Sequence, residues 1–161
     1  MQTLTHLLEF LPEHPAISWV PFHPSHVSQM RLAPNVTRSL SKALPLDVML
    51  ANQAKHGHAV TAYLHGSPAA CFGCVDIWEG VAEMWLLVEE RARKYGKTMT
   101  RAAIGYRDFI VLSRNLHRLQ VTVRNDSISA VNWAKLIGFE PECVMRRYGA
   151  DKSDFILMSR V

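Results

Sequence analysis

The chain has 161 residues, of which 48% are hydrophobic and 20% are charged, a balance that excludes a disordered or fibrous protein and fits a single domain over residues 1–161. Three cysteines are too few for a disulfide framework at this length. We expect a soluble cytoplasmic protein, because no apolar run reaches the roughly 20 residues of a membrane helix and the first residues lack the basic start and cleavage site of a signal peptide.

The formal net charge of +4 is unevenly distributed along the chain. Residues 1–90 hold four Lys and Arg against eight Asp and Glu, whereas residues 91–161 hold fourteen against six. Clustered cations raise the local concentration of anions such as phosphates, although a solvated basic face has the same composition. Any anionic partner is therefore expected at the second half.

The first 58 residues are divided into short windows by six prolines. One strand is expected at 17–22, because this stretch is rich in residues with high β propensity. Helical segments are expected at 25–32 and 36–54, the second of them interrupted at Pro45.

A three-stranded antiparallel meander is predicted to follow. Its strands are expected at 59–64, 69–78 and 81–88, with turns at 65–68 and at 79–80. The hydrophobic period then changes to the spacing of an amphipathic helix that begins near Lys97. Its core-facing residues are predicted to be Met99, Ala102, Ala103, Tyr106, Phe109 and Ile110.

A strand at 119–123, a second helix and a final hairpin at 143–147 and 155–160 complete the predicted order. Asp126 or Ser127 is expected to cap this second helix, and Gly138 fits a left-handed carboxyl-terminal cap that leads Phe139 into the core. The residues of this helix that are expected to face the core are Ile128, Val131 and Leu136. This order predicts an α/β (α+β) layer fold with a mixed sheet.

Five cations and no carboxylate lie between residues 91 and 101. This stretch joins a predicted strand to a predicted helix, an arrangement that binds phosphate because the first N–H groups of a helix have no intrahelical partner and its dipole is positive there. Gly96 would let the backbone approach such a ligand closely. The same residues also fit an exposed basic turn with Gly96 as a simple bend. A nucleotide P-loop is excluded, because Arg91 stands where that motif requires its first glycine.

Three stretches resemble the GNAT N-acetyltransferase superfamily: 83–88, 93–98 and 123–139. The pyrophosphate loop of that family reads Gln/Arg-x-x-Gly-x-Gly/Ala, which Arg93 and Gly96 match and Thr98 does not. The family's fifth strand runs into an Asn, here Asn125, and its next helix closes with Leu-Gly-Phe, here Ile-Gly-Phe at 137–139. The stretches 66–73 and 85–87 are also similar to GNAT-like proteins of tailed bacteriophages.

The resemblance implies a mixed, mostly antiparallel sheet that is flanked by helices and has splayed central strands, and it implies acetyl-CoA as cosubstrate. Backbone N–H groups in the basic loop would hold the pyrophosphate, the pantetheine would pair with the strand that ends at Val88, and Asn125 would contact the pantetheine arm. The N–H of Val88 or of a neighbour would stabilise the oxyanion. The cofactor-binding residues implied in this way are Leu87, Val88, Arg93, Lys94, Tyr95, Gly96, Lys97, Thr98 and Asn125.

Acyl transfer to an amine needs a general base and a general acid. Glu83 is the expected base, directly or through a water molecule, because strand alternation places it on one face with Trp85 and Leu87. The family commonly places the acid, a Tyr, four residues before the Gly of Leu-Gly-Phe, where this chain has Ala134. Tyr148 is the expected substitute, with Tyr95 as the alternative.

The expected function is acetyl-CoA-dependent acetylation of an amine on a protein. The alternative, favoured by Thr98 and Ala134, is a non-catalytic GNAT-like phage accessory or virion-associated protein, which would lie in the host cytoplasm. A nucleic-acid partner is not expected, because the aromatic residues are not interleaved with the cations. No metal site is expected either, since Cys71 and Cys74 have zinc-knuckle spacing but would lie on opposite faces of one strand and lack a second ligand pair.

Overall fold

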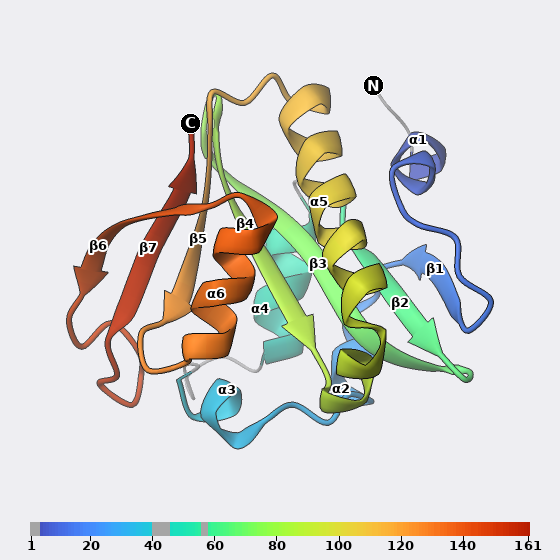
Figure 1. The fold of residues 1–161 in the computed structure, drawn as a ribbon, viewed down its shortest axis with the longest axis horizontal. Coiled ribbons are helices and arrows are strands. Elements are labelled where there is room, and N and C mark those ends of the chain that lie inside the picture. Colours follow the sequence, from blue (N-terminus) through green and yellow to red (C-terminus); the bar gives the residue numbers. More distant parts are fainter. Residues whose placement is uncertain (1–3, 40–45, 56–57) are drawn as a thin grey trace.

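The computed structural model describes residues 4–39, 46–55 and 58–161. Its centre is a seven-stranded sheet with the strand order β1-β2-β3-β4-β5-β7-β6 (Figure 1). Neighbouring strands are antiparallel, except that β4 and β5 are parallel. The strands are β1 (Ile17–Pro21), β2 (Val60–Leu64), β3 (Ser67–Trp78), β4 (Val81–Val88), β5 (Arg118–Arg124), β6 (Glu140–Met145) and β7 (Phe155–Arg160). The predicted fold class, a mixed and mostly antiparallel sheet with helices, is confirmed.

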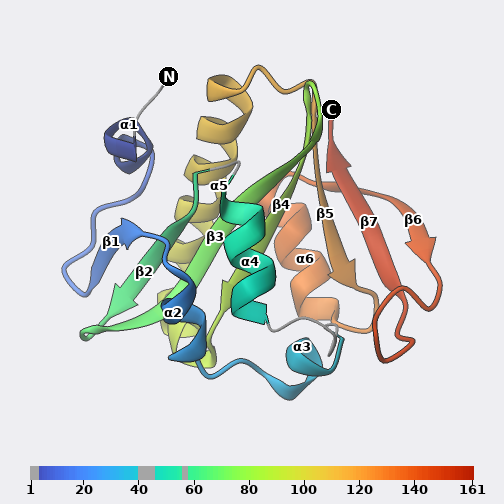
Figure 2. The same ribbon diagram turned by 180° about the vertical axis from the view of Figure 1, so that it is seen from behind.

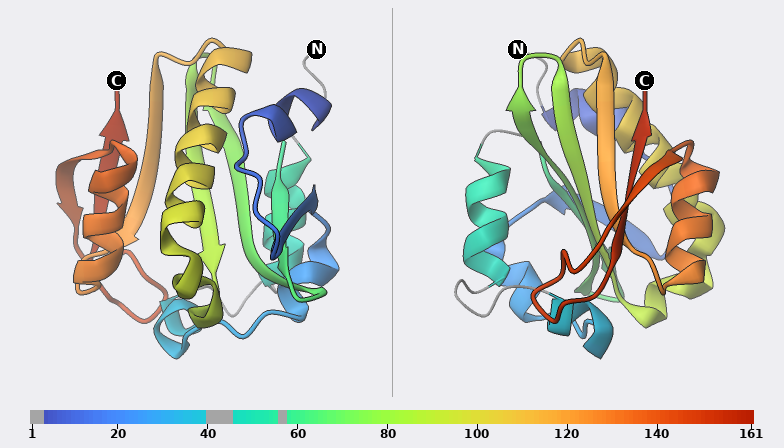
Figure 3. Two further views of the ribbon diagram at one scale, coloured as in Figure 1. Left: turned by 45° about the vertical axis from the view of Figure 1, so that its right-hand side comes forward. Right: turned by 90° about the vertical axis from the view of Figure 1, so that its left-hand side faces the viewer.

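Helices cover both faces of this sheet (Figures 2 and 3). They are α1 (Leu4–Glu9), α2 (Pro24–Ser28), α3 (Pro34–Ser39), α4 (Leu46–Ala54), the 3-10 helix η1 (Glu90–Tyr95), α5 (Gly96–Ser113) and α6 (Ile128–Ile137). In the edge-on view of Figure 3, α5 and α6 lie on one face, whereas α2 and α4 lie on the other. Within the described residues, none of the helices combines the length and the apolar character that a membrane span requires.

The core lies mainly between the sheet and α5. All six residues that were predicted to form the apolar stripe of this helix are buried, each with at most 2% of its surface exposed. Across from them, Phe72 of β3 packs its ring 6.1 Å from that of Tyr106. Phe10, which follows α1, packs edge-on against Phe109. The helical period of the sequence therefore identified the main core element correctly.

The hairpin between β2 and β3 is tighter than predicted. His65 and Gly66 have positive φ angles of 50° and 82°, and Leu64 pairs directly with Ser67. A two-residue loop with both central residues at positive φ matches the right-handed twist of the flanking strands. For this reason β3 begins at Ser67, two residues before the predicted start.

The helices of the first half are shorter than predicted. Helix α2 ends at Ser28, and the segment predicted as one interrupted helix contains two, α3 and α4. The predicted interruption at Pro45 lies outside the described residues. Strand β6 spans Glu140–Met145 rather than 143–147, because Arg147 adopts a positive φ of 56° and ends the extended run.

Helix α6 faces the core with a stripe that only partly matches the predicted one, since Val131 packs against the core as expected. Ile128 and Leu136 are 73% and 66% exposed, so their predicted core positions are wrong. The buried residues are Ala134 and Ile137, three apart, which places Leu136 well off their stripe and Ile128 on the opposite side of the helix. Gly138 has a φ of 104° and forms the predicted left-handed cap. Phe139 follows it into the core, with 2% of its surface exposed.

Candidate functional site

The two central strands separate along their length. Strand β4 pairs with β5 only from Val81 to Glu83, opposite Arg118 to Gln120. Beyond that point β4 stays paired with β3, whereas β5 stays paired with β7 as far as Arg124. The resulting opening belongs to a cavity of about 580 Å³ that both strands line. The expected splay of the central strands is confirmed.

The edge of β4 that faces this opening carries unpaired backbone groups. The Glu89 N–H donates to the Ala69 carbonyl at 2.9 Å, so the adjacent pair Val88–Ala70 is one whose backbone groups point away from each other. By the same alternation, the N–H and C=O groups of Leu86 and Val88 point from β3 towards the opening. Pairing with β5 has already ended there, so no strand among the described residues pairs with these groups and a ligand can bind them.

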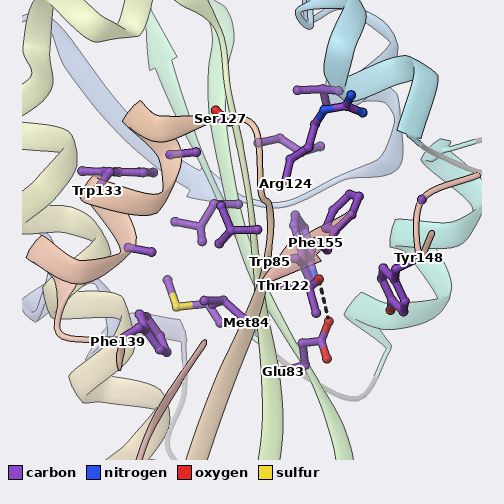
Figure 4. A pocket seen from close by; sticks show the side chains of 18 of the residues that line it. Glu83, Met84, Trp85, Thr122, Arg124, Ser127, Trp133, Phe139, Tyr148 and Phe155 are labelled. Atoms are coloured by element: carbon purple, nitrogen blue, oxygen red, sulfur yellow. Dashed lines mark hydrogen bonds between the residues drawn. The ribbon is translucent and has the colours of Figure 1, made fainter. Parts of the chain in front are cut away.

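The cavity extends to both faces of the sheet (Figure 4). On the α6 side it is lined by Ala130, Trp133, Ala134, Ile137 and Phe139. On the opposite side it is lined by residues of α3 and α4 together with Glu83, Trp85, Tyr148 and Phe155. Two molecules that enter from opposite faces could therefore meet in the opening between the strands.

Glu83 lies where these two sides meet. Its carboxylate accepts hydrogen bonds from two side chains of β5, Gln120 Nε2 at 3.0 Å and Thr122 Oγ1 at 3.3 Å. Figure 4 shows the second of these bonds. Two donors do not exhaust the lone pairs of a carboxylate. Glu83 is therefore held in place and can still accept a hydrogen bond from a ligand.

Tyr148 reaches the same cavity from the connection between β6 and β7. Its ring packs edge-on against Phe155 at 5.4 Å, and the side chain is 56% exposed. Desolvation raises the pKa of the Tyr148 phenol, and the negative charge of Glu83 raises it further. The phenol therefore carries its proton at neutral pH, and the structure brings the two expected catalytic side chains to one cavity.

An arginine on β5 organises the connection that carries Tyr148. Arg124 donates to both carboxylate oxygens of Asp126 at 2.8 and 3.0 Å, to Asp151 at 2.8 Å and to Ser153 Oγ at 3.0 Å. The Ser153 hydroxyl, which donates to Asp151, and secondly the Arg124 guanidinium hold the pKa of the Asp151 carboxyl well below its usual range. Sequence analysis did not single out Arg124, because its partners lie up to 29 positions away.

The segment expected to be a phosphate-binding loop is helical. Residues Glu90–Tyr95 form the 3-10 helix η1, which runs directly into α5 at Gly96. Gly96 has an ordinary helical φ of −53°, so neither the expected loop nor the alternative bend at Gly96 is present. A Cβ added at Gly96 would have no protein atom within 4 Å. The first turn of α5 is therefore open to a ligand.

Not all of the expected cations point to this open surface. Arg91 is bound to Glu89 at 2.5 Å and to the carbonyls of Leu64, Ser67 and Pro68 at 2.7–3.1 Å. It fastens the β2–β3 hairpin to the end of β4 and does not contribute to an anion site. Three of the remaining four, Arg93, Lys94 and Lys97, are exposed beside the start of α5; Arg93 also pairs with Glu90 at 3.1 Å.

A hydrogen-bonded chain connects the cavity to the start of α5. The Trp133 indole N–H, from the cavity wall, donates to Thr100 Oγ1 at 2.9 Å. The Thr100 hydroxyl in turn donates to the Gly96 carbonyl at 2.7 Å.

Of the other expected cofactor-binding residues, Leu87 lines the cavity. Asn125 is exposed and lies in a separate polar pocket, where its N–H donates to the Asp154 carbonyl at 2.9 Å.

The buried cysteines are far from nucleophilic. Cys71 contacts Thr61 and Met30, whereas Cys74 contacts Arg114 on the other face of β3, as predicted. Burial raises the pKa of the Cys71 thiol to about 11 and that of Cys74 to about 12.

Among the residues that the structure describes, no three His, Cys, Asp or Glu side chains are grouped to hold a metal ion.

Comparisons with known proteins identify the fold but give no relative by sequence. No protein-family model matches the chain, and no curated protein matches its sequence significantly. Among solved structures, Ard1 from Thermoplasma volcanium has a TM-score of 0.72 at 18% identity, with 90% of this chain and 97% of that chain covered.

Two further structures were solved with a coenzyme. RimL, a ribosomal L7/L12 α-N-protein acetyltransferase in complex with coenzyme A, has a TM-score of 0.68 at 15% identity and covers 94% of this chain and 97% of its own. A GNAT family acetyltransferase from Elizabethkingia anophelis with acetyl-CoA bound has a TM-score of 0.63 at 12% identity. The match covers 91% of this chain and 98% of that chain. The chain therefore has the fold of the GNAT acetyltransferases.

Proposed function

We propose that the protein is an acetyl-CoA-dependent N-acetyltransferase that transfers an acetyl group to an amine of a protein. The observation that carries this proposal is the opening between β4 and β5. Backbone groups of Leu86 and Val88 that no described strand pairs face this opening, and the adjoining cavity is lined by Leu86, Glu83 and Tyr148. The shared fold with coenzyme-bound acetyltransferases supports the same assignment.

The described residues fit acetyl-CoA at three places. The diphosphate fits the first turn of α5, where the positive end of the helix dipole and the exposed Lys94 and Lys97 favour an anion and Gly96 leaves the surface open. The amide groups of the pantetheine fit the unpaired edge of β4. The apolar wall formed by α6 would cover this arm, and Trp133 connects that wall to α5.

Acetyl-CoA supplies an acyl group that is activated as a thioester. Glu83 takes a proton, through a water molecule, from the ammonium form of the acceptor, so that the amine attacks as a neutral nucleophile. The water is needed because five residues of strand separate Glu83 from Val88 by about 16 Å. The Val88 N–H donates to the carbonyl oxygen, whose negative charge grows during the attack.

The C–N bond forms as the C–S bond breaks, and Tyr148 gives its proton to the departing sulfur. The nitrogen then loses its second proton, which returns to Tyr148. The first proton, taken up by Glu83, is released to solvent in each turnover.

A protein acceptor is supported by the known activities of proteins with this fold. RimL acts on the α-amine of a ribosomal protein, and another neighbour, from Vibrio fischeri, is a ribosomal-protein-S5-alanine acetyltransferase. The acceptor side of the cavity opens at Tyr148, which is more than half exposed. The end of a polypeptide can approach from this side.

One observation favours the alternative, a non-catalytic protein of phage origin that keeps the fold and binds another protein. Ala134 lines the cavity where the family commonly has a catalytic tyrosine, and it offers no proton. The alternative predicts that the protein releases no coenzyme A with any amine. The proposed enzyme instead uses Tyr148 from the opposite face of the sheet.

The test is an acetyl-transfer assay on the purified protein. Release of coenzyme A is followed with a thiol reagent in the presence of acetyl-CoA and short peptides with free α-amines, and the peptides are then examined by mass spectrometry. We expect release that depends on the peptide, together with the mass increase of one acetyl group. Release that is equal with and without peptide, or no release at all, would contradict the proposal.

A further inference from the structure

We infer that the acceptor is a monoamine on an apolar or aromatic body, bound with its ammonium group at Glu83; this inference rests on the proposed function. For a protein acceptor, it means the α-amine of a chain whose first residue is apolar, rather than a lysine in a basic segment. The inference depends on the side of the cavity opposite α6, which we call the acceptor chamber.

The walls of the acceptor chamber are apolar. Helix α4 contributes Leu46, Met49 and Leu50, and the opposite wall is formed by Phe155 of β7 beside Tyr148 (Figure 4). Such walls stabilise an apolar or aromatic group by removing its surface from water. They offer few partners to a hydroxylated or charged substituent.

The floor of the chamber is an indole that is fixed in place. Trp85 of β4 lies directly over Gly73 of β3, so that a Cβ at position 73 would be 1.9 Å from the ring. Phe22 packs edge-on against the indole at 5.4 Å. The aromatic face is therefore part of the folded structure before any ligand binds, and the absence of a side chain at Gly73 makes room for it.

The chamber offers one counter-charge. Among the described residues that line the cavity, Glu83 is the only carboxylate and Arg124 the only cation, and the charge of Arg124 is already balanced by Asp126 and Asp151. One ammonium group can pair with Glu83, but a second would be buried without a partner, which is unfavourable. The exposed Arg146 and Arg147, next to Tyr148, would also repel a polycation at the entrance.

The experiment compares four acceptors on the same protein. Two are monoamines with apolar bodies, phenethylamine and a short peptide with a free amino-terminal Phe. Two carry more than one cation, spermidine and a peptide with an acetylated amino terminus and one internal Lys between two Arg residues. We expect kcat/KM to be higher for the first pair by about 100-fold, since burying an unpaired charge is the main difference. Comparison within the first pair shows whether a small amine or a peptide end is preferred.

A charge-insertion pair tests whether the chamber itself causes this selectivity. Met49→Glu places a second carboxylate in the chamber and should shift the ratio of kcat/KM values towards spermidine by at least about tenfold. Val48→Glu adds the same charge to the same helix at a position that is 42% exposed and outside the cavity lining. It should leave the ratio unchanged.

The outcomes separate this inference from the proposed function. The inference would be overturned if kcat/KM for spermidine equalled or exceeded that for the monoamines. It would also be overturned if Met49→Glu and Val48→Glu had the same ratio of kcat/KM values for spermidine and the monoamines. Neither result would exclude acetyl transfer. Acetyl-CoA that binds by calorimetry without acetylation of any of the four amines would overturn it too. No binding of acetyl-CoA at all would instead remove the proposed function on which the inference rests.

Discussion

Glu83 illustrates how far one residue can be interpreted from sequence and where structure adds to it. Strand alternation predicts its face correctly, because side chains on a strand alternate strictly between two faces. The structure adds two donors on β5, Gln120 and Thr122, that hold the carboxylate at the point where β4 and β5 separate. The contacts of Glu83 therefore support its proposed role as the general base.

Replacement of Glu83 by Gln should remove the base and keep the shape of the site. We expect kcat to fall by about 100-fold or more, which is the usual contribution of a general base, while the dissociation constant for acetyl-CoA changes less than about twofold. Steady-state kinetics and calorimetry on the same preparation measure both. A Glu83→Gln protein with unchanged kcat would exclude Glu83 as the base.

The buried thiols predict how stability depends on alkaline pH. The pKa of Cys71 is raised to about 11 and that of Cys74 to about 12, above the ordinary value of 9.0. Between these values the unfolded chain binds fewer protons than the folded one, so the free energy of unfolding must fall as pH rises.

Urea midpoints should therefore decrease between about pH 8 and pH 10.5, and the decrease should be smaller in a variant with both cysteines replaced by alanine. A urea midpoint that stays constant with pH would show that these thiols are not desolvated. The same conclusion would follow if the midpoint changed equally with pH in the wild-type protein and in the variant.

At the scale of single elements, the start of α5 gives the sharpest contrast. A side chain at Gly96 meets no protein atom within 4 Å, whereas one at Gly105 of the same helix would lie 1.9 Å from the Phe10 carbonyl oxygen. Gly96→Leu should keep the melting temperature or raise it, because glycine weakens a helix by about 0.5–1 kcal/mol, but it should weaken acetyl-CoA binding by at least about tenfold.

Gly105→Ala is the matched control for this prediction. It should lower the melting temperature, because α1 must move to accommodate the new methyl group, and it should leave the coenzyme affinity of the folded protein nearly unchanged. Unchanged acetyl-CoA affinity in Gly96→Leu would contradict the assignment of the anion site to this helix end.

The connection between β6 and β7 is the second element with a testable role. We expect Arg124→Gln to release residues 149–153, lower kcat by about tenfold through misplacement of Tyr148, and leave acetyl-CoA binding intact. The rate of amide hydrogen exchange in residues 149–153 should rise in the same variant.

Arg118→Gln is the comparison for Arg124→Gln. Arg118 is on the same strand and makes a similar two-bond ion pair, with Glu142 of β6 at 2.7 and 2.8 Å, but it lies at the other end of β5. Its loss should leave the amide hydrogen exchange of residues 149–153 as it is. The control is limited to this exchange, because Arg118 also donates to Gln120 at 3.1 Å and Gln120 holds Glu83. Equal exchange of residues 149–153 in both variants would show that Arg124 does not hold this connection in place.

Elements with a clear local period could be predicted from the sequence, whereas contacts between distant segments could not. The stripe of α5, the meander and the cap at Gly138 follow from local spacing and turn chemistry. The hydrogen bonds of Arg91 and Arg124 bring together segments that are up to 29 positions apart, and no local pattern reports them. The error on Ile128 has a related cause, because an apolar residue in the first turn of a helix does not reveal which side the sheet covers.

At the scale of the whole molecule, the sheet separates two substrates and lets them meet in its middle. Helices α5 and α6 cover the face proposed for the coenzyme, and α3, α4 and the β6–β7 connection surround the face proposed for the amine (Figure 3). The cavity joins the two faces at the place where β4 and β5 stop pairing. The proposed reaction therefore depends on the splay of these strands.

Isothermal titration of the wild-type protein with acetyl-CoA tests the central claim most directly. The free edge of β4, the open first turn of α5 and the apolar wall of α6 together predict one molecule bound per chain, with a dissociation constant in the micromolar range and weaker binding as salt increases. The absence of any binding heat at millimolar acetyl-CoA, confirmed by an unchanged melting temperature, would contradict the account.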